Sequence, residues 1–388
     1  MTMMEKLLLT LLVASWLYWL AALIMVHIFF NERHESDFNF TPPVSILKPV
    51  KGIDAQAYEN FVSFCRQDYP EYEVIFGVMD PDDPVIPVIK HLQHDYSSIS
   101  TRLVICPALG SNRKASLLHQ LSMEARFEVL VASDSDMRVT PDYLRRVVAP
   151  LADSRIGLVT CPYRGDKPLT LTARLEALYM TGTFLPSVVV ARQFLDMHFA
   201  MGATNVMRRS DLARLGGFAA VADYLADDYQ LGARMAALGL RVHLSDYVVD
   251  SILGATTFFE QWYREVRWAR CNRVSRPREY PGLLLSFSTP LAMILLIESG
   301  YSSSAWLAVA VSLLIRWWVA WSTMGYAGNI NIRYYLIWLP VRDILSVIIW
   351  CAGGIGRRVT WRGEVYILLD DGRMQPAVVS PEYQHTSP

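Results

Sequence analysis

The chain has 388 residues, of which 52% are hydrophobic and 19% are charged, and it contains 11 tryptophans. This composition excludes a disordered or low-complexity protein, because such chains lack the apolar side chains that a folded core requires. Lys and Arg total 36 against 37 Asp and Glu, so the chain lacks the basic excess that binds phosphates of nucleic acid. We therefore expect no nucleic-acid partner, and we expect part of the apolar length to lie in lipid.

The first predicted element is a membrane anchor. The segment from Leu7 to Phe30 contains no Asp, Glu, Lys or Arg, and about 20 apolar residues are enough to cross a bilayer core. A cleaved signal peptide would end in small residues, whereas this segment ends in Ile28-Phe29-Phe30. We therefore predict an uncleaved N-terminal anchor over residues 1–31.

Residues 42–281 have an ordinary composition in which short β-rich runs alternate with helical stretches. This alternation predicts an α/β fold with a mainly parallel sheet. The expected strands are Val44–Leu47, Glu73–Val78, Arg102–Ile105, Glu128–Ala132 and Gly157–Thr160. The expected helices are Ala55–Arg66, Val85–His94, Lys114–Ala125 and Asp142–Leu151.

The cysteines indicate a reducing compartment for this domain. They are five in number and none lies close to another in the sequence, which fits neither a disulfide framework nor a zinc site. We therefore expect residues 42–281 to lie in the cytosol.

A candidate metal site follows the fourth predicted strand. Asp134 and Asp136 stand two residues apart in Asp134-Ser135-Asp136, and in open α/β sheets ligands bind beyond the carboxyl ends of the strands. Mg²⁺ and Mn²⁺ prefer such oxygen ligands and share them with phosphates. An ordinary polar turn is the alternative, since Asp-Ser-Asp is also a common turn sequence.

Two further segments contain candidate donor-binding residues: a turn that follows a predicted strand and a loop that precedes a predicted helix. Asp83 lies in Asp80-Pro81-Asp82-Asp83-Pro84, where a carboxylate could accept hydrogen bonds from a nucleobase or ribose, although an Asp- and Pro-rich turn is the simpler interpretation. Lys114 ends the loop from Gly110 and opens a helix, a position suited to a diphosphate. A plain helix N-cap explains that loop equally well.

The last polar candidates lie near the end of the domain. Asp227 and Asp228 precede a predicted helix, and adjacent carboxylates raise each other's pKa, which prepares one as a general base; they could also simply cap the helix. The arginines from Arg264 to Arg276 recur every three residues. They could clamp a leaving diphosphate, or attract anionic lipid from a membrane-proximal helix.

Apolar stretches dominate the C-terminal part, over the predicted membrane region 282–356. They are Leu283–Ile297, Ala305–Ala327 and Tyr334–Gly354. Arginines flank the region on both sides, and positive flanks tend to stay cytoplasmic. An even number of crossings is then required, so one segment is expected to be interfacial or re-entrant, or else the predicted tail, residues 357–388, lies outside.

The weakest span candidate by sequence is Tyr334–Gly354, because Arg342 and Asp343 lie at its centre and charges in lipid are costly. These two residues could pair with protein groups, or they could line a channel for a lipid headgroup or acceptor. The shorter apolar run Phe184–Val190 could lie in the interface or line an acceptor groove, and a buried core segment is the equal alternative.

In this order the motifs resemble the ceramide glucosyltransferase family (family 21), which are inverting glycosyltransferases of the GT-A fold. The resemblance extends over nearly the whole chain. It is carried by Lys48–Asp54, Asp68–Val74, Asp82-Asp83-Pro84, Gly157–Val159, Met207-Arg208-Arg209 leading to Gly216-Gly217, and Trp361-Arg362-Gly363. Within that family the segments Ser63–Pro70, Ser111–Lys114, Asp134–Val139 and Arg267–Arg270 most resemble the bacterial hopanoid-biosynthesis glycosyltransferases.

The resemblance implies a role for each motif. It implies that Asp83 holds uridine, that Asp134 binds the metal and diphosphate, and that Asp228 is the general base. It places the closing motif on Arg264, Arg267 and Trp268. Animal ceramide enzymes have Asp-Ser-Gly where this chain has Asp134-Ser135-Asp136, which implies firmer metal binding here.

The implied activity is a single displacement in which a lipid hydroxyl attacks a UDP-sugar, with Mg²⁺ or Mn²⁺ as cofactor. The resemblance implies N-acetylglucosamine or glucose as the sugar and a hopanoid polyol or ceramide as the acceptor. It also implies a bacterial inner-membrane protein with its catalytic domain in the cytoplasm. The alternatives are a processive β-glycan synthase, which normally carries Gln where this chain has Arg264, and a non-catalytic membrane protein that binds nucleotide-sugar.

Overall fold

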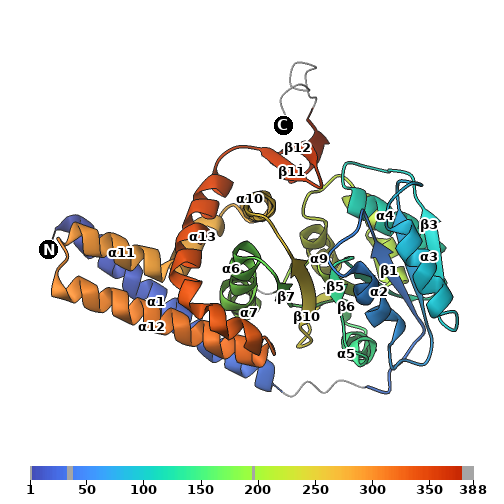
Figure 1. Cartoon of the computed structure of the whole chain (residues 1–388), viewed down its shortest axis with the longest axis horizontal. Coiled ribbons are helices and arrows are strands. Elements are labelled where there is room, and N and C mark those ends of the chain that lie inside the picture. The colour runs from blue at the N-terminus through green and yellow to red at the C-terminus, as the bar shows by residue number, and fades with distance from the viewer. Residues whose placement is uncertain (1, 33–37, 195–196, 378–388) are drawn as a thin grey trace.

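The structure is a computed structural model that describes residues 2–32, 38–194 and 197–377. A bundle of apolar helices extends from one side of an α/β domain, and the N-terminal and C-terminal helices lie side by side within that bundle (Figure 1). The C-terminal strands leave the bundle and return to the α/β domain. The chain therefore combines a membrane-type part and a mixed α/β part that contact each other.

The α/β domain is built on a seven-stranded sheet. Its first four strands are parallel, β8 runs antiparallel to both of its neighbours, and β6 and β9 are parallel to each other. In spatial order the strands are β3 (Ser100–Ile105), β2 (Tyr72–Val78), β1 (Val44–Pro49), β4 (Val129–Ser133), β8 (Thr204–Arg208), β6 (Ile156–Thr160) and β9 (Arg241–Leu244). This mixed, mainly parallel sheet confirms the expected fold class.

Helices cover both faces of the sheet, because its central strands are buried on both sides. One face packs against α2 (Ala57–Cys65), α3 (Ile86–Asp95) and α5 (Tyr143–Val148). The other packs against α4 (Arg113–Glu124), α8 (Arg209–Arg214) and α9 (Asp227–Ala237). The five strands and four helices predicted from the sequence are all present, with ends that shift by a few residues and a 3₁₀ turn, Ala149–Ala152, that completes the last helix.

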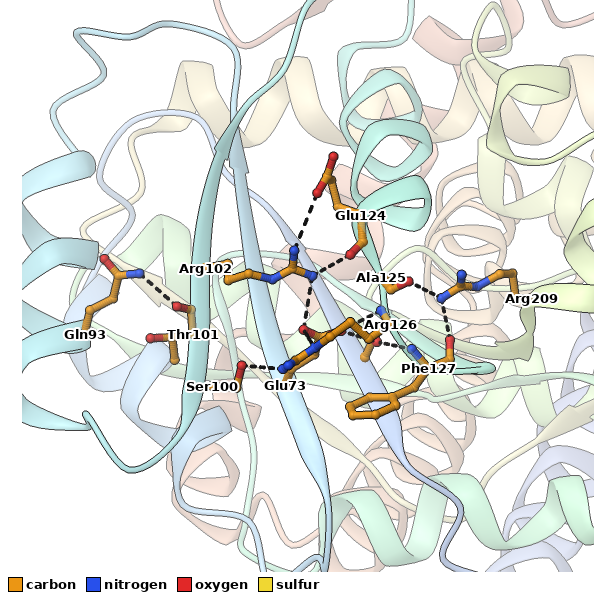
Figure 2. Close-up of polar contacts among 11 residues, drawn as sticks. Glu73, Gln93, Ser100, Thr101, Arg102, Glu124, Ala125, Arg126, Phe127 and Arg209 are labelled. Atoms are coloured by element: carbon orange, nitrogen blue, oxygen red, sulfur yellow. Dashed lines mark hydrogen bonds and ion pairs between the residues drawn. The ribbon is translucent and has the colours of Figure 1, made fainter.

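A charged cluster fixes the amino ends of the parallel strands, away from the edge that carries the candidate site (Figure 2). Glu73 is fully buried and accepts hydrogen bonds from Ser45 Oγ (2.7 Å), Arg126 Nε (2.9 Å) and Arg102 Nη2 (3.1 Å). Burial alone would raise the pKa of Glu73, but these hydrogen bonds and the two arginine charges outweigh it and lower the pKa. The cluster thus ties three strands together at one edge.

A second sheet and a continuous helical segment lie between the large sheet and the membrane helices. The sheet has the order β5 (Met137–Arg138), β10 (Val249–Gly254) and β7 (Tyr163–Pro168). The helical segment runs through α6 (Leu171–Tyr179), a π-type turn η2 (Met180–Phe184) and α7 (Leu185–Phe194). The predicted run Phe184–Val190 therefore belongs to a helical segment that packs against the apolar N-terminal helix α1 (Met3–Asn31).

Three helices are long and apolar enough to cross a membrane, or up to four if a bent pair is counted as one span. They are α1, α12 (Ser303–Tyr326) and the segment Ile330–Gly354, which joins the 3₁₀ segment η5 (Ile330–Trp338) to α13 (Leu339–Gly354). The bent pair is η4 (Tyr280–Ser286) with α11 (Ser288–Glu298), which meet at 73°. The Leu283–Ile297 stretch is therefore the broken one, and the expectation that Tyr334–Gly354 would be the weakest is corrected.

Ion pairs within the protein explain why charges are tolerated in these helices. Arg316 is fully buried and donates to Asp343 at 2.8 Å, while its guanidinium lies 3.9 Å from the centre of the Trp19 ring. Arg342 donates to Glu265 at 2.6 Å. Because each charge meets an opposite charge inside the protein, the segment avoids the cost of an isolated charge in lipid. Pairing with protein groups, one of the two predicted alternatives for Arg342 and Asp343, is confirmed. Arg342 also lines the cavity described below, so the channel alternative stays a prediction.

The last part of the chain differs from the expected tail. Residues 358–376 form an antiparallel sheet of β11 (Arg358–Trp361), β12 (Glu364–Leu368) and β13 (Met374–Pro376). Its apolar side chains Val359, Tyr366, Leu368 and Met374 are buried against Leu225 of the α/β domain. The cause is the alternation of apolar side chains along these strands, which gives the sheet one face to bury. Residues 378–388 of the predicted tail lie outside the described residues.

Candidate active site

A cavity of about 1260 Å³ opens where the sheet meets the membrane helices. Its polar half is lined by the carboxyl ends of β1 and β4 and by the first turns of α4 and α9. The candidate residues that line it are Lys114, Asp134, Asp136, Asp228, Arg264, Arg267 and Trp268. The structure therefore brings together all the predicted site residues except Asp83.

The Asp134-Ser135-Asp136 turn begins directly after β4. The amide of Met137 donates to the carbonyl of Asp134, which closes the turn. Asp136 accepts a hydrogen bond from Ser251 at 3.0 Å, and Ser135 donates to Asp54 at 2.5 Å. Burial raises the pKa of Asp136 to about 6, and the charges of Asp54 and Asp134 add to that effect. The turn thus concentrates negative charge that a cation would relieve.

Two carboxylates are a partial ligand set for a metal ion. Among the described residues no group of three or more His, Cys, Asp or Glu side chains could hold a metal ion. Mg²⁺ in particular is commonly bound by one or two carboxylates together with substrate phosphates. Asp134 and Asp136 therefore fit a divalent cation that shares its remaining positions with a bound diphosphate.

Two lysines lie beside this turn, Lys48 fully buried and Lys114 partly buried. Lys114 Nζ is 2.5 Å from Asp134 Oδ1 and donates to the carbonyl of Gly202 at 2.8 Å. Lys48 is fully buried and donates to the carbonyl of Asp134 at 2.5 Å, with its ammonium 3.7 Å from the centre of the Phe64 ring. Burial lowers the pKa of Lys48 to about 7 against the opposing effect of the aspartates. Lys114 differs, because the surrounding aspartate charges outweigh its burial and raise its pKa.

The candidate base lies across the cavity at the start of α9. Asp227 is buried and accepts a hydrogen bond from Asn112 at 3.2 Å, so it ties α9 to the N-cap of α4. Asp228 lines the cavity and lies close to the backbone of Gly202. A Cβ atom added at Gly202 would lie 3.2 Å from Asp228 Oδ2, so a larger residue there would crowd the carboxylate. Burial, with the charge of Asp227 second, raises the pKa of Asp228 to about 7. Asp228 thus has the open position and the near-neutral pKa that a general base requires.

Helix α10 (Phe258–Ser275) supplies the closing motif, and the structure separates its two arginines. Arg264 forms two hydrogen bonds with the fully buried Glu176, at 2.7 and 2.5 Å. Arg267 forms no ion pair with any described carboxylate and lies 5.0 Å from the centre of the Trp361 ring. Arg267 is therefore the cation of this motif that remains available to an anion in the cavity.

The arginines farther along α10 have structural partners. Arg273 donates to the carbonyls of Gly354 and Gly356 at 2.7 and 2.6 Å, and Arg270 donates to that of Ile355 at 3.1 Å. These carbonyls lie at the C-terminal end of α13, where a cation is favourable. This part of the arginine run caps a membrane helix.

Asp83 does not line the cavity. Its carboxylate is nearly buried and accepts hydrogen bonds from the amides of Gly52 at 3.0 Å and Val85 at 2.9 Å. Asp83 therefore holds the loop after β1, whose residues 49–51 and 53–55 do line the cavity. Contact between Asp83 and a uridine stays a prediction.

The other half of the cavity is apolar and lies among the membrane helices. Its lining residues come from α1, η2, α7, η4 and α13. They include Tyr18, Phe184, Val188, Phe194, Leu283, Phe287, Ile349 and Trp350. The run Phe184–Val190 thus contributes to the groove, as one of its two predicted interpretations requires.

Sequence reasoning missed four residues of this site: Lys48, Asp54, Glu176 and Arg362. Arg362 donates to Asp54 at 3.0 Å across a separation of 308 residues, and Glu176 meets Arg264 across 88. The sequence shows Lys48 at the end of an apolar strand and Arg362 in Trp361-Arg362-Gly363. Neither pattern identifies the residue that the side chain contacts in the fold. The pairing of these residues depends on the tertiary fold.

The sheet, the Asp-x-Asp turn after β4 and the acidic pair at the start of α9 define the protein as a glycosyltransferase of the GT-A fold that carries membrane helices. The fold agrees with a solved mannosyltransferase from Pyrobaculum calidifontis, determined with GDP-Man and Mn²⁺. The TM-score is 0.56 at 19% identity, and the match covers 88% of this chain and 98% of that one.

The chain belongs to glycosyltransferase family 21, which it matches over residues 7–374. It is similar to ceramide glucosyltransferase 3 of Caenorhabditis elegans, at 24% identity over 86% of this chain and 74% of the relative. It is also similar to ceramide glucosyltransferase 1 of that organism, at 23% identity over 94% of this chain and 82% of the relative. The predicted family, that of the ceramide glucosyltransferases, and the predicted class of enzyme are confirmed.

Proposed function

We propose that the protein transfers one sugar from a UDP-sugar to a hydroxyl group of a membrane lipid, with inversion at the anomeric carbon. One observation carries the proposal: a single cavity has aspartates and cationic side chains at one end, with Arg267 free of any described carboxylate partner, and apolar membrane-helix side chains at the other. A polar nucleotide-sugar fits the first end and a lipid fits the second. The reacting atoms would meet between them.

The chemistry at the polar end follows from Asp228. A carboxylate with a pKa of about 7 is substantially ionised at neutral pH, yet basic enough to take the proton of an attacking hydroxyl. The acceptor oxygen would form its bond to the anomeric carbon as the bond to the UDP oxygen breaks. The proton passes to Asp228, and one displacement of this kind inverts the anomeric configuration.

The leaving diphosphate requires positive charge. Lys114 and Arg267 both line the cavity, and the raised pKa of Lys114 keeps it protonated. A divalent cation held by Asp134 and Asp136 would neutralise the charge that develops on the leaving UDP. The neighbour of the same fold, solved with Mn²⁺, supports this proposal for the cation.

The apolar end supports a lipid acceptor. The names of the curated relatives specify ceramide as a substrate, and the motifs quoted above favour a hopanoid polyol. We propose one of these two acceptor classes, with N-acetylglucosamine or glucose as the sugar. We further propose that the protein lies in a bacterial inner membrane with its catalytic domain in the cytoplasm, where the nucleotide-sugar is available.

The direct test is to incubate the purified full chain, in nanodiscs that contain extracted bacterial lipids, with radiolabelled UDP-N-acetylglucosamine or UDP-glucose. A product that carries a single sugar on a lipid supports the proposal, and mass spectrometry of that product identifies sugar and acceptor. A long polymer would instead indicate a processive synthase. No product with either donor, under conditions where the protein is folded, would contradict the proposed transfer.

A second experiment tests the acceptor end alone. Leu283 lines the apolar half of the cavity, so Leu283→Trp should narrow it. We expect lipid transfer to fall much more than UDP-sugar hydrolysis. Met293→Trp is the matched control, because Met293 lies on α11, is 39% exposed and does not line the cavity. Equal loss of transfer and hydrolysis in Leu283→Trp would contradict an acceptor role for this end.

A further inference from the structure

The turn between β11 and β12 enters the polar half of the cavity. Trp361, Arg362 and Gly363 all line it, together with the Asp134-Ser135-Asp136 turn. The hairpin is held over the cavity by an ion pair of 2.5 Å between Glu364 and Arg113, the first residue of α4. A side chain at the tip of this hairpin is therefore directed at the donor end of the site.

Arg362 occupies a backbone position that does not favour arginine. Trp361 pairs with Glu364 in the strand register, so Arg362 and Gly363 form a two-residue hairpin turn. Their φ angles are +49° and +83°, which is the left-handed conformation of a type I′ turn. That turn prefers Asn, Asp or Gly at its first position. A non-glycine residue in this region is disfavoured, and such residues concentrate at functional sites.

The sheet that carries Arg362 is anchored to the catalytic domain. The amide of Met374 donates to the carbonyl of Asp223 at 2.7 Å, and the amide of Leu225 donates to the carbonyl of Gly372 at 3.1 Å. The contacted residues, Asp223 and Leu225, lie just before the acidic pair Asp227-Asp228 in the sequence, at the start of α9. The position of Arg362 is thus fixed relative to the candidate base.

The charges of the cavity identify what Arg362 would meet. Five aspartates line it: Asp54, Asp134, Asp136, Asp227 and Asp228. Four of its cations have ion pairs of 2.6 Å or shorter: Arg113 with Glu364, Lys114 with Asp134, Arg264 with Glu176 and Arg342 with Glu265. Among the described residues the Arg362 side chain pairs with Asp54 alone, at 3.0 and 3.5 Å, and it is 47% exposed. A planar guanidinium in that position can turn from a carboxylate to a phosphate with little rearrangement.

We propose that Arg362 binds the diphosphate of the nucleotide donor and that the C-terminal sheet is a fixed part of the donor site, with Asp54 holding the guanidinium until the nucleotide arrives. This inference rests on the proposed function, because it requires a nucleoside diphosphate as ligand. It assigns the C-terminal sheet of β11, β12 and β13 to donor binding. The centre of the Trp361 ring lies 5.0 Å from the guanidinium of Arg267, which lines the cavity together with Lys114.

The test is isothermal titration calorimetry of the purified full chain with UDP and, separately, with uridine. Arg362→Asn replaces the arginine by a residue that the turn prefers, so the fold should be retained or stabilised, which a thermal melt checks. We expect UDP affinity to fall about 10- to 100-fold, the loss of one or more charge-assisted hydrogen bonds. Uridine affinity should not change. Arg357→Asn is the matched control, because Arg357 is exposed and pairs with Asp370 away from the cavity.

The variant Asp54→Asn distinguishes diphosphate binding by Arg362 from a purely structural role of the Arg362–Asp54 ion pair in holding the hairpin. If Arg362 binds the diphosphate, freeing it from Asp54 should leave UDP affinity equal to or higher than that of the wild type. If Asp54→Asn weakens UDP binding as much as Arg362→Asn does, Arg362 acts only by tying the hairpin and the inference is wrong. Unchanged UDP affinity in Arg362→Asn would overturn it as well, while leaving the proposed function intact. Absence of UDP binding to the wild type would instead contradict the proposed function itself.

Discussion

Replacing Asp228 by Asn removes the candidate base with almost no change in shape. The side chain lines the cavity, and within the described residues its one hydrogen bond is from the amide of Tyr229 at 2.7 Å, which an Asn oxygen can also accept. The substitution also removes one of two adjacent negative charges, so folding should not suffer. Any large effect on the rate then reports the chemistry of the carboxylate.

The expected magnitude has two parts. Loss of a general base typically lowers the rate about 10²–10⁴-fold, so Asp228→Asn should lose at least about 100-fold in kcat/KM. In the wild type the raised pKa of about 7 means that Asp228 is protonated, and unable to accept a proton, at lower pH. Between pH 6 and pH 8 the ionised fraction rises roughly tenfold for such a pKa, and kcat/KM should rise with it.

The assay is transfer from radiolabelled UDP-sugar at limiting donor concentration, from pH 5.5 to pH 9, because kcat/KM reports the groups of the free enzyme. Asp223→Asn is the matched control, since Asp223 is exposed, does not line the cavity, and its bond to the amide of Ser111 can be kept by Asn. The control should retain the wild-type rate and pH profile. The reasoning fails if Asp228→Asn keeps more than a tenth of the activity, or if its remaining activity still rises through pH 7.

Three further outcomes are expected. EDTA should abolish transfer and Mn²⁺ should restore it, and Asp136→Asn should require more Mn²⁺ for half-maximal activity; activity indifferent to EDTA would exclude the metal role. Glu73→Gln should lower the free energy of unfolding by about 1–3 kcal/mol, because buried hydrogen bonds to a charge are lost, and calorimetry should find UDP affinity unchanged. Arg316→Met should destabilise the protein by about 3–5 kcal/mol by leaving Asp343 buried without its partner. The double variant Arg316→Met with Asp343→Leu should recover stability in a thermal melt, and no recovery would contradict the pairing.

Much of the α/β domain could be predicted because its signals are local. The strands around Val131 and Phe76 are short apolar runs between polar loops, as expected of strands buried on both faces. The strands of the second sheet were not predicted. β10 mixes polar and apolar residues without alternation, and β7 is largely polar, so neither differs clearly from a loop in sequence.

The candidate site was predictable wherever one short motif contains its chemistry. Asp134 and Asp136 lie in one turn, and Asp228 stands beside Asp227. The sequence placed Arg264 and Arg267 in one motif without distinguishing them, whereas in the structure Glu176 on another helix forms an ion pair with Arg264. A sequence motif identifies a residue type and its spacing, whereas its availability to a ligand depends on which distant partner packs against it.

The membrane helices illustrate the same limit. Arg342 and Asp343 make one segment look unsuited to lipid when each residue is considered alone. In the folded protein they pair in different directions, Asp343 with α12 and Arg342 with α10. The charges that weakened the prediction of a span are the contacts that join this helix to the rest of the protein.

Helix α10 fixes the position of the donor end of the cavity relative to the membrane helices, which matters for a reaction between a soluble donor and a membrane-bound acceptor. Its Arg267 faces the donor end of the cavity, its Glu265 forms a buried ion pair with α13, and its Arg273 caps the end of the same membrane helix. Because breaking one member of a buried ion pair is costly, these contacts oppose sliding of α10 along α13. The height of the candidate base above the membrane helices is then set by the fold. An acceptor anchored in the bilayer needs only to reach a fixed position, which reduces the entropy cost of bringing its hydroxyl to the sugar.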